Sequence, residues 1–126
     1  MIKFNKKIVL ELYKKIVYYT GGTFGIREES MLDSALEVPF QTFGGEELYP
    51  TTLSKAARLG YGLVANHPFI DGNKRIGIYV MLVFLSVNGY EFEFSDDEII
   101  DIALGTASGK YGYEDIFKIL LEKSDE

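Results

Sequence analysis

An apolar run over residues 76–87, IGIYVMLVFLSV, constrains the fold of this chain more than any other feature. Its side chains are apolar on nearly all sides, which is typical of a helix surrounded by other helices. The run is too short to cross a bilayer and too long for most strands, which rarely exceed about ten residues. Asn88 and Gly89 follow it as a C-terminal stop signal. We therefore predict a buried central helix that starts near Asp71 or Gly72.

Apolar residues in steps of three and four predict further helices around the central one. These are a helix from Asn5 to Thr20 that stops at Gly21-Gly22, a short helix from Ser30 that ends before Pro39, a helix from Thr51 or Thr52 to near Asn66, a helix opened by a capping box of Ser95 and Glu98, and a last helix over 113–122. Residues 40–49, FQTFGGEELY, predict an exposed flap or short hairpin, and residues 90–94 predict extended chain. The expected fold class is an all-α bundle with a central buried helix and one flap.

The composition favours one globular domain and excludes several classes of function. With 126 residues, 47% of them hydrophobic, the chain is long enough to bury a core, and we expect one domain over residues 1–126. The absence of cysteine excludes disulfides and thiolate metal clusters, and it suits a reducing cytoplasm. A formal net charge of −6 argues against direct binding of nucleic acid. No signal peptide or membrane span is visible in the sequence.

The stretch HPFIDGNKR, residues 67–75, leads into the central helix and poses an electrostatic problem. Lys74 and Arg75 fall in the first turn of that helix, where a cation is disfavoured by roughly 0.3–1 kcal/mol. A bound anion would make the position of these two cations favourable. The unpaired N–H groups of a helix N-terminus also bind phosphates. Gly72 permits close approach, Arg75 can grip two oxygens and Lys74 adds a point charge. The pattern therefore predicts a polyphosphate site.

Other residues of the same loop suit phosphate chemistry. Asp71 is a hard carboxylate of the kind that binds Mg²⁺ together with substrate phosphates. Asn73 either donates to a phosphate oxygen or caps the helix, and His67 suits proton abstraction from an attacking hydroxyl. Phe69 is expected to point into the core and pin the loop. Each residue alone has an ordinary interpretation as a turn, a cap or a solvated side chain, but their coincidence in one loop favours catalysis.

The stretch HPFIDGNKR resembles the signature loop of the Fic/Doc superfamily, His-x-Phe-x-Asp/Glu-Gly-Asn followed by Gly or Lys and then Arg. Three further segments are similar to family segments: GIREESMLDSALEVP at 25–39, LGYGLVANHPF at 59–69 and VFLSVNGYEF at 83–92. With lysine at position 74, the stretch resembles the motif of the Doc branch, which comprises the death-on-curing toxins of bacterial and phage toxin–antitoxin modules. The resemblance covers most of the chain.

This resemblance implies a small helical fold with the loop between two central helices, and a role for each residue of the loop. In the family the histidine is the general base, the acidic residue holds Mg²⁺, and the Gly-Asn-x-Arg segment binds nucleotide phosphates. Carried over, these roles fall on His67 as base, Asp71 as metal ligand, Gly72, Asn73, Lys74 and Arg75 at the phosphates, and Phe69 as anchor of the loop. The flap, expected within residues 40–49, is where such proteins hold the target segment by strand addition.

Two departures from the adenylylating Fic pattern bear on the reaction. Lys74 occupies room that glycine leaves for a phosphate, and Ile78 stands where the full Fic motif has a second arginine. The resemblance to Doc thus implies transfer of the γ-phosphate of Mg²⁺–ATP to a Ser or Thr hydroxyl of a translation factor of the elongation factor Tu class, which inhibits translation. The alternatives are transfer of AMP or another nucleotide moiety, and a catalytically silent module that binds an antitoxin or regulates.

The autoinhibitory pattern of Fic proteins, Ser/Thr-x-x-x-Glu-Gly/Asn, has a loose match here in Thr42 and Glu46, without the final residue. We therefore expect that a separate antitoxin protein binds in trans and folds onto this protein. The resemblance and the composition together predict a cytoplasmic enzyme that uses ATP and Mg²⁺ and contacts neither membrane nor nucleic acid.

Overall fold

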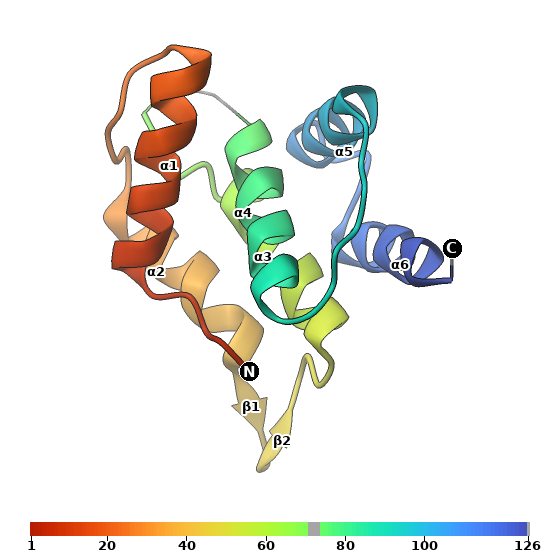
Figure 1. Ribbon diagram of the computed structural model, residues 1–126. Helices are drawn as coiled ribbons and strands as arrows, with labels where there is room; N and C mark the ends of the chain where they lie inside the picture. Colours follow the sequence, from red (N-terminus) through yellow and green to blue (C-terminus); the bar gives the residue numbers. More distant parts are fainter. Residues whose placement is uncertain (71–73, 126) are drawn as a thin grey trace.

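The chain folds into helices joined by short connections, with one small hairpin (Figure 1). The computed structural model describes residues 1–70 and 74–125. The elements in these two ranges are α1 (Lys6–Thr20), α2 (Glu29–Glu37), the 3-10 turn η1 (Val38–Phe40), β1 (Thr42–Phe43), β2 (Glu46–Glu47), α3 (Thr52–Ala65), α4 (Arg75–Val87), α5 (Asp96–Ala107) and α6 (Tyr113–Ser124). This arrangement confirms the expected all-α fold class. Of the helices described, none has the length and apolar character that a bilayer span requires.

Helix α4 occupies the centre of the fold, as the apolar run over 76–87 predicts. Figure 1 shows α1 on one side of it, α5 on the other and α3 behind it, and these helices all contact α4. The side chains that α4 buries almost completely are Ile76, Ile78, Val80, Met81, Phe84 and Leu85. Full burial of such a side chain stabilises the fold by about 1.5–3 kcal/mol. Packing on all sides therefore fixes the position of α4 and of the residues at its start.

Two glycines allow α3 and α4 to approach closely. A Cβ atom on Gly60 of α3 would lie 2.7 Å from Sδ of Met81, and one on Gly77 of α4 would lie 2.8 Å from Cγ2 of Val64. Non-bonded heavy atoms do not pack at such distances, so a larger residue at either position would require its neighbours on the other helix to shift. The close approach sets the end of α3 beside the start of α4, where the loop of interest runs.

Helix starts agree with the sequence where the capping residue is a near neighbour in the chain. The Asn5 side chain accepts a hydrogen bond from the N–H of Ile8 at 2.9 Å. Ser95 and Glu98 form the predicted capping box at the start of α5, and Thr51 caps α3. Such short-range hydrogen bonds satisfy the free N–H groups of a first turn, which is why the sequence alone reveals them.

The predicted cap of the second helix is wrong. Helix α2 begins at Glu29, with Glu28 as its N-cap, rather than after Ser30. The backbone N–H groups of Arg27 and Glu28 both donate to the carbonyl oxygen of Pro68, at 2.6 and 3.2 Å. These tertiary hydrogen bonds keep the chain extended up to Glu28 and place the helix start there.

Helix α4 also begins later than predicted. Its N-cap is Lys74 and its first residue is Arg75, not a residue near position 71 or 72. The chain before it is tied down, because the N–H of Ile70 donates to the carbonyl oxygen of Gly25 at 2.9 Å. Residues 71–73 lie outside the described residues.

The predicted hairpin is confirmed as the antiparallel pair β1 and β2. Lys55 of α3, which is buried, fastens its base to the helix. The Nζ atom of Lys55 forms an ion pair with Glu47 at 3.0 Å and donates to the carbonyl oxygen of Tyr49. Residues 90–94 connect α4 to α5 without forming a strand.

The position of the hairpin bears on one expectation. It precedes the N-terminal end of α3, whereas residues 66–70 follow the C-terminal end (Figure 1). A helix of 14 residues separates its two ends by about 21 Å. The hairpin thus lies at the opposite end of α3 from residues 66–70, and the role of residues 40–49 in holding a target segment stays a prediction.

Candidate functional site

His67 directly follows the end of α3, in a backbone conformation that few side chains adopt. Its φ of 50° lies in the left-handed region, and no other non-glycine residue in 1–70 or 74–125 has a positive φ. The N–H of His67 donates to the carbonyl oxygen of Val64 at 3.3 Å, which closes the last turn of the helix. The left-handed conformation costs a non-glycine residue roughly 1–2 kcal/mol. Such strain persists where the surroundings enforce it, and it is common at functional sites.

Arg27, which lies just before α2, holds the conformation of this turn through its side chain. Its Nε donates to the carbonyl oxygen of His67 at 2.8 Å, and its Nη2 donates to that of Asn66 at 3.4 Å. The last carbonyl groups of a helix lack partners within the helix, and a guanidinium is a strong donor to them. The Asn66 side chain in turn donates to the carbonyl oxygen of Met31 at 3.1 Å. The half-buried imidazole of His67 is thus carried by a turn with fixed partners.

Phe69 ties the same loop to the core. Its side chain is 4% exposed and stacks on Tyr13 of α1 with a centroid distance of 4.1 Å. Its backbone pairs with that of Ile26 in an antiparallel bridge. Gly25 lies against the next residue, because a Cβ atom there would lie 2.4 Å from Cδ1 of Ile70. The segment that borders the loop is therefore 24–28, not the hairpin.

The start of α4 combines the positive end of a helix with two cations. Lys74 is exposed at the N-cap, and Arg75 is half-buried as the first helical residue. No side chain of the described residues caps this helix, and its first turn carries no acidic residue. An anion would accept hydrogen bonds from the free N–H groups and would reverse the unfavourable charge interaction. The geometry therefore suits a phosphate group.

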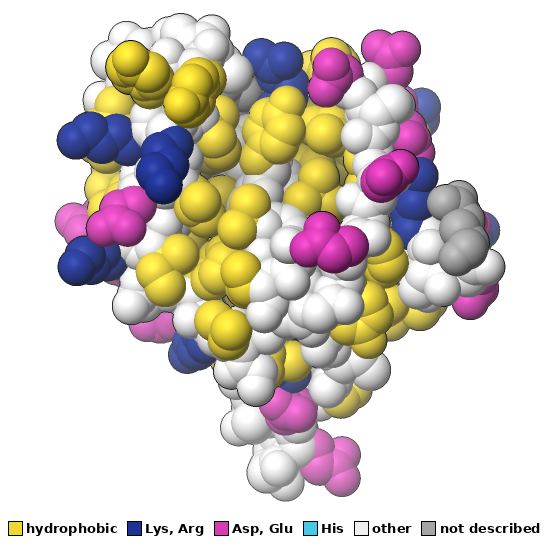
Figure 2. Space-filling model, in the orientation of Figure 1, with side chains coloured by type: hydrophobic (Ala, Val, Ile, Leu, Met, Phe, Trp, Pro, Cys, Tyr) yellow, Lys and Arg dark blue, Asp and Glu magenta, His cyan; other side chains and the backbone are white. Residues whose placement is uncertain are grey.

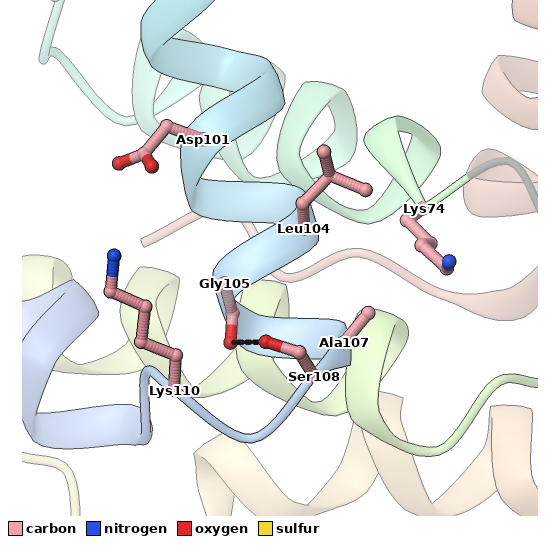
Figure 3. Close-up of a pocket in the computed structure, with 7 residues that line it drawn as sticks. All are labelled: Lys74, Asp101, Leu104, Gly105, Ala107, Ser108 and Lys110. Atoms are coloured by element: carbon pink, nitrogen blue, oxygen red, sulfur yellow. Dashed lines mark hydrogen bonds between the residues drawn. The ribbon is translucent and has the colours of Figure 1, made fainter.

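Two adjoining cavities extend from this helix start along α5. One, of about 280 Å³, is lined by Lys74, Arg75, Ile100, Ala103 and Leu104. The other, of about 410 Å³, is lined by Lys74, Asp101, Leu104, Gly105, Ala107, Ser108 and Lys110, and Figure 3 shows these side chains around it. Leu104, which is 53% exposed, provides apolar surface shared by both cavities. Together the cavities have the size and the mixed lining of a small-molecule site.

Asp101, at the far end of the larger cavity, has a fixed partner. The hydroxyl group of Tyr111 donates to Asp101 Oδ2 at 2.8 Å, and this hydrogen bond raises the pKa of Tyr111. The carboxylate keeps further acceptor capacity for a hydroxyl group. The side chain is therefore a suitable partner for a bound sugar.

Three of the residues expected at the site are not among the described ones. Asp71, Gly72 and Asn73 lie outside the described residues. In the part of the chain that is described, no three His, Asp or Glu side chains gather as a metal cluster would require. A Mg²⁺ ion held through a nucleotide needs only one or two carboxylates, because phosphates and waters complete its coordination. The donor chemistry of Asp71 fits that demand.

Sequence reasoning missed Arg27, Ile26 and Tyr13 as residues that build the site. All three act over long separations along the chain, through a side chain on a distant carbonyl group, a single bridge and a ring stack. The sequence offers one hint, which is that Arg27 lies in segment 25–39, a segment similar to those of the family. Local spacing contains no information about such partners.

Comparisons with known proteins fit this geometry. The model of the Fic/DOC family matches residues 3–85, from the N-terminal side of α1 into α4. Toxin Doc of Mycolicibacterium smegmatis is 36% identical to this chain over 84 residues, which are 65% of this chain and 65% of that protein. The chain thus spans just under two thirds of the length of this curated relative. Because the family match runs through the α3–α4 pair and the whole loop between them, the chain belongs to the Fic/DOC family.

Proposed function

We propose that this protein is the toxin of a toxin–antitoxin module and a Mg²⁺–ATP-dependent kinase that phosphorylates a Ser or Thr of a translation factor of the elongation factor Tu class. The observation that carries this proposal is the start of α4, where Lys74 and Arg75 stand at a helix N-terminus that no side chain of residues 1–70 or 74–125 caps. Membership of the Fic/DOC family supports a transferase that acts on proteins. Similarity to a protein named Toxin Doc supports the role of toxin.

The phosphates of the nucleotide bind at the start of α4. Arg75 grips two oxygens of one phosphate and Lys74 adds a point charge. Gly72 and Asn73, which lie outside the described residues, are expected from the sequence to contribute N–H donors to the phosphates. Asp71 would hold Mg²⁺ together with the phosphates, and the ion would neutralise charge on the transferring group.

His67 accepts the proton of the attacking hydroxyl. The hydroxyl oxygen bonds to the γ-phosphorus as the bond to the bridging oxygen of ADP breaks, and the proton moves to an imidazole nitrogen. Arg27 holds the carbonyl group of His67, so the imidazole keeps its place while the phosphoryl group moves. Most of the acceleration comes from positioning and from charge.

The nucleoside of ATP extends from the phosphates into the cavities along α5. Leu104 offers an apolar surface along this path, since it lines both cavities. Asp101 and Ser108 offer hydrogen-bonding groups for the nucleoside, and Asp101 lies at the far end from Lys74 (Figure 3). The cavities are cationic at the start of α4 and partly apolar along α5, so they suit a nucleoside triphosphate better than a free phosphate.

Two residues favour transfer of the γ-phosphate over transfer of AMP. The Lys74 side chain stands at the helix start, where a glycine would leave room for a further phosphate. Ile78 is fully buried in the core, so no second guanidinium is available at that position. Nucleotidyl transfer is the alternative outcome of the test below.

Inhibition of this protein by a separate antitoxin is supported by where its loose match to the autoinhibitory pattern of Fic proteins lies. Thr42 and Glu46 lie in β1 and β2, not in a helix, and the length of α3 separates them from the loop. They are therefore in no position to block the nucleotide. We infer that a cytoplasmic antitoxin binds in trans.

Labelled ATP tests the reaction. Wild-type protein with γ-labelled ATP, Mg²⁺ and a bacterial lysate is expected to label a protein of the elongation factor Tu class. His67→Asn is the matched variant, because asparagine tolerates the left-handed backbone but is no base at neutral pH. It is expected to bind Mg²⁺–ATP as the wild type does and to transfer no label.

Three results would contradict the proposal. Equal labelling by wild type and His67→Asn would remove His67 as base. Transfer of label only from α-labelled ATP would establish nucleotidyl transfer. Absence of Mg²⁺–ATP binding in a calorimetric titration of folded protein would leave a silent module that binds an antitoxin.

A further inference from the structure

The larger cavity along α5 contains a carboxylate with no cationic partner. Of the described residues that line this cavity, Asp101 is the only acidic one, and it lies at the end away from Lys74 (Figure 3). Its side chain is exposed, and no Lys, Arg or His of residues 1–70 and 74–125 lies within 4.0 Å of it. The carboxylate is therefore available to a ligand.

One oxygen of this carboxylate has a fixed hydrogen bond. The Tyr111 hydroxyl group donates to Oδ2 of Asp101 at 2.8 Å, whereas Oδ1 accepts no hydrogen bond from residues 1–70 or 74–125. Because each oxygen of an ionised carboxylate accepts about two hydrogen bonds, Oδ1 can accept from two neighbouring hydroxyl groups at once. The orientation set by Tyr111 lowers the entropy cost of such a contact.

Tyr111 is itself held in place by α5. A Cβ atom on Gly105 would overlap the ring of Tyr111, so the glycine leaves the space in which this ring lies. The backbone N–H of Tyr111 donates to the carbonyl oxygen of Gly105 at 3.0 Å, and Nζ of Lys110 lies 5.2 Å from the centre of the ring. Tyr111 lines a neighbouring cavity of about 340 Å³ between α5 and α6 rather than the one that reaches Lys74. It therefore orients Asp101 without touching what the larger cavity binds.

We propose that Asp101 makes the nucleotide site selective for ribonucleotides, because its Oδ1 accepts hydrogen bonds from the 2′- and 3′-hydroxyl groups of the ribose. This inference rests on the proposed function, in which the phosphates bind at the start of α4 and the nucleoside extends along α5. Leu104 lines the cavities together with Lys74, and Asp101 is three residues away from Leu104, about 4.5 Å along α5. A single nucleotide spans such a path.

The other groups of the cavity favour a sugar over a metal ion at Asp101. The described lining offers one carboxylate and two lysines, Lys74 and Lys110, which is an unfavourable donor set for a divalent cation. A deoxyribose supplies one hydroxyl donor fewer than ribose and leaves one acceptor site of Oδ1 to water. The loss of one such hydrogen bond at an exposed site weakens binding by about fivefold.

Calorimetric titration of the full chain in the presence of Mg²⁺ tests the proposal with three nucleotides: ATP, 2′-deoxy-ATP and 3′-deoxy-ATP. The wild type is expected to bind ATP about fivefold more tightly than either deoxynucleotide. Asp101→Asn keeps the size of the side chain and removes its charge. In this variant ATP should bind more weakly, the deoxynucleotides should change less, and the preference should fall below about twofold.

Tyr111→Phe separates orientation of the carboxylate from general damage to the fold. The variant keeps the ring against Gly105 and loses only the hydroxyl group that holds Asp101. We expect a preference for ATP between those of the wild type and Asp101→Asn, with unchanged affinity for the deoxynucleotides. Equal weakening of all three nucleotides would show that Tyr111 has a structural role only, which would remove it from the proposal as the positioning residue.

The first turn of α5 offers a matched control for the loss of charge. It carries Asp96, Asp97 and Glu98, and Figure 2 shows Asp and Glu side chains over this part of the molecule. Asp97 is exposed and lines neither cavity of the proposed nucleotide site. Asp97→Asn should therefore keep the wild-type preference for ATP.

Three outcomes would overturn the proposal. These are equal affinity of the wild type for all three nucleotides, an undiminished preference in Asp101→Asn, and an equal loss of preference in Asp97→Asn. Each of them leaves binding of ATP intact, and with it the proposed function. Absence of binding of all three nucleotides to folded wild-type protein would overturn the proposed function and this inference together, so the two failures give different results.

Discussion

Arg27 donates a hydrogen bond from Nε to the carbonyl oxygen of His67 at 2.8 Å, across 40 positions of sequence. The contact compensates for the absence of glycine at the left-handed position after α3, because a cationic donor stabilises the helix end that carries the strain. The place of the imidazole therefore depends on a residue that touches neither nucleotide nor target in our mechanism.

Removal of this contact is expected to reduce turnover more than nucleotide binding. Arg27→Ala should lower kcat by about 100-fold, because a small displacement of a catalytic group has effects of that size, with little change in KM for ATP. Arg27→Lys should restore part of kcat, since an ammonium keeps one donor. Steady-state kinetics with labelled ATP measures both constants. A rise in KM with kcat unchanged would show that Arg27 serves binding instead.

The sequence predicts those parts of this fold that depend on near neighbours. Asn5 and the Ser95–Glu98 box cap their helices through hydrogen bonds that span three residues, and the apolar run over 76–87 is buried as its composition requires. The start of α2 and the place of the hairpin depend on partners far along the chain. Pro68 accepts from Arg27 and Glu28, and no periodicity encodes that contact. The residues of the loop can be recognised from the sequence because their chemistry is concentrated in one stretch. The residues that hold the loop in place, Arg27, Ile26 and Tyr13, are far from it in sequence and cannot be recognised in this way.

Close packing of α3 on α4 is expected to fail when Gly77 gains a methyl group. Gly77→Ala should destabilise the fold by about 1–2 kcal/mol, because overpacking of roughly 1–3 kcal/mol is only partly offset by the better helix propensity of alanine. Val64→Ala removes the methyl group that lies 2.8 Å from the added carbon. The double variant should therefore be more stable than the sum of the single effects predicts, by at least about 0.5 kcal/mol. Urea unfolding of all four proteins measures the coupling, and strict additivity would refute the contact.

The free energy of unfolding should decrease in acid because Glu98 becomes protonated. Its hydrogen bond with the backbone N–H of Ser95, and then its contact with Lys123, lower the pKa of this carboxyl group. A lowered pKa in the folded state means that the stabilisation is present above the ordinary value of about 4.3 and is lost as pH falls through the folded value. Glu98→Gln keeps the cap without the charge. Thermal unfolding should show wild type above the variant at pH 7, by a difference that shrinks as pH falls below about 4.3, while Glu46→Gln, in the exposed hairpin, should follow wild type over the same range.

Lys74 is expected to decide which phosphate is transferred, and two variants separate its charge from its volume. Lys74→Met keeps most of the bulk and loses the charge, so transfer of the γ-phosphate should slow by about tenfold without a change of product. Lys74→Gly loses both and opens room at the start of α4, so a further phosphate can enter and label from α-labelled ATP should appear on the target. Intact-protein mass spectrometry distinguishes one added phosphate from one added AMP. If Lys74→Gly transferred the γ-phosphate at the wild-type rate, the lysine would have no part in placing the nucleotide, and the choice of reaction would have to lie in residues 71–73 or in the buried position of Ile78.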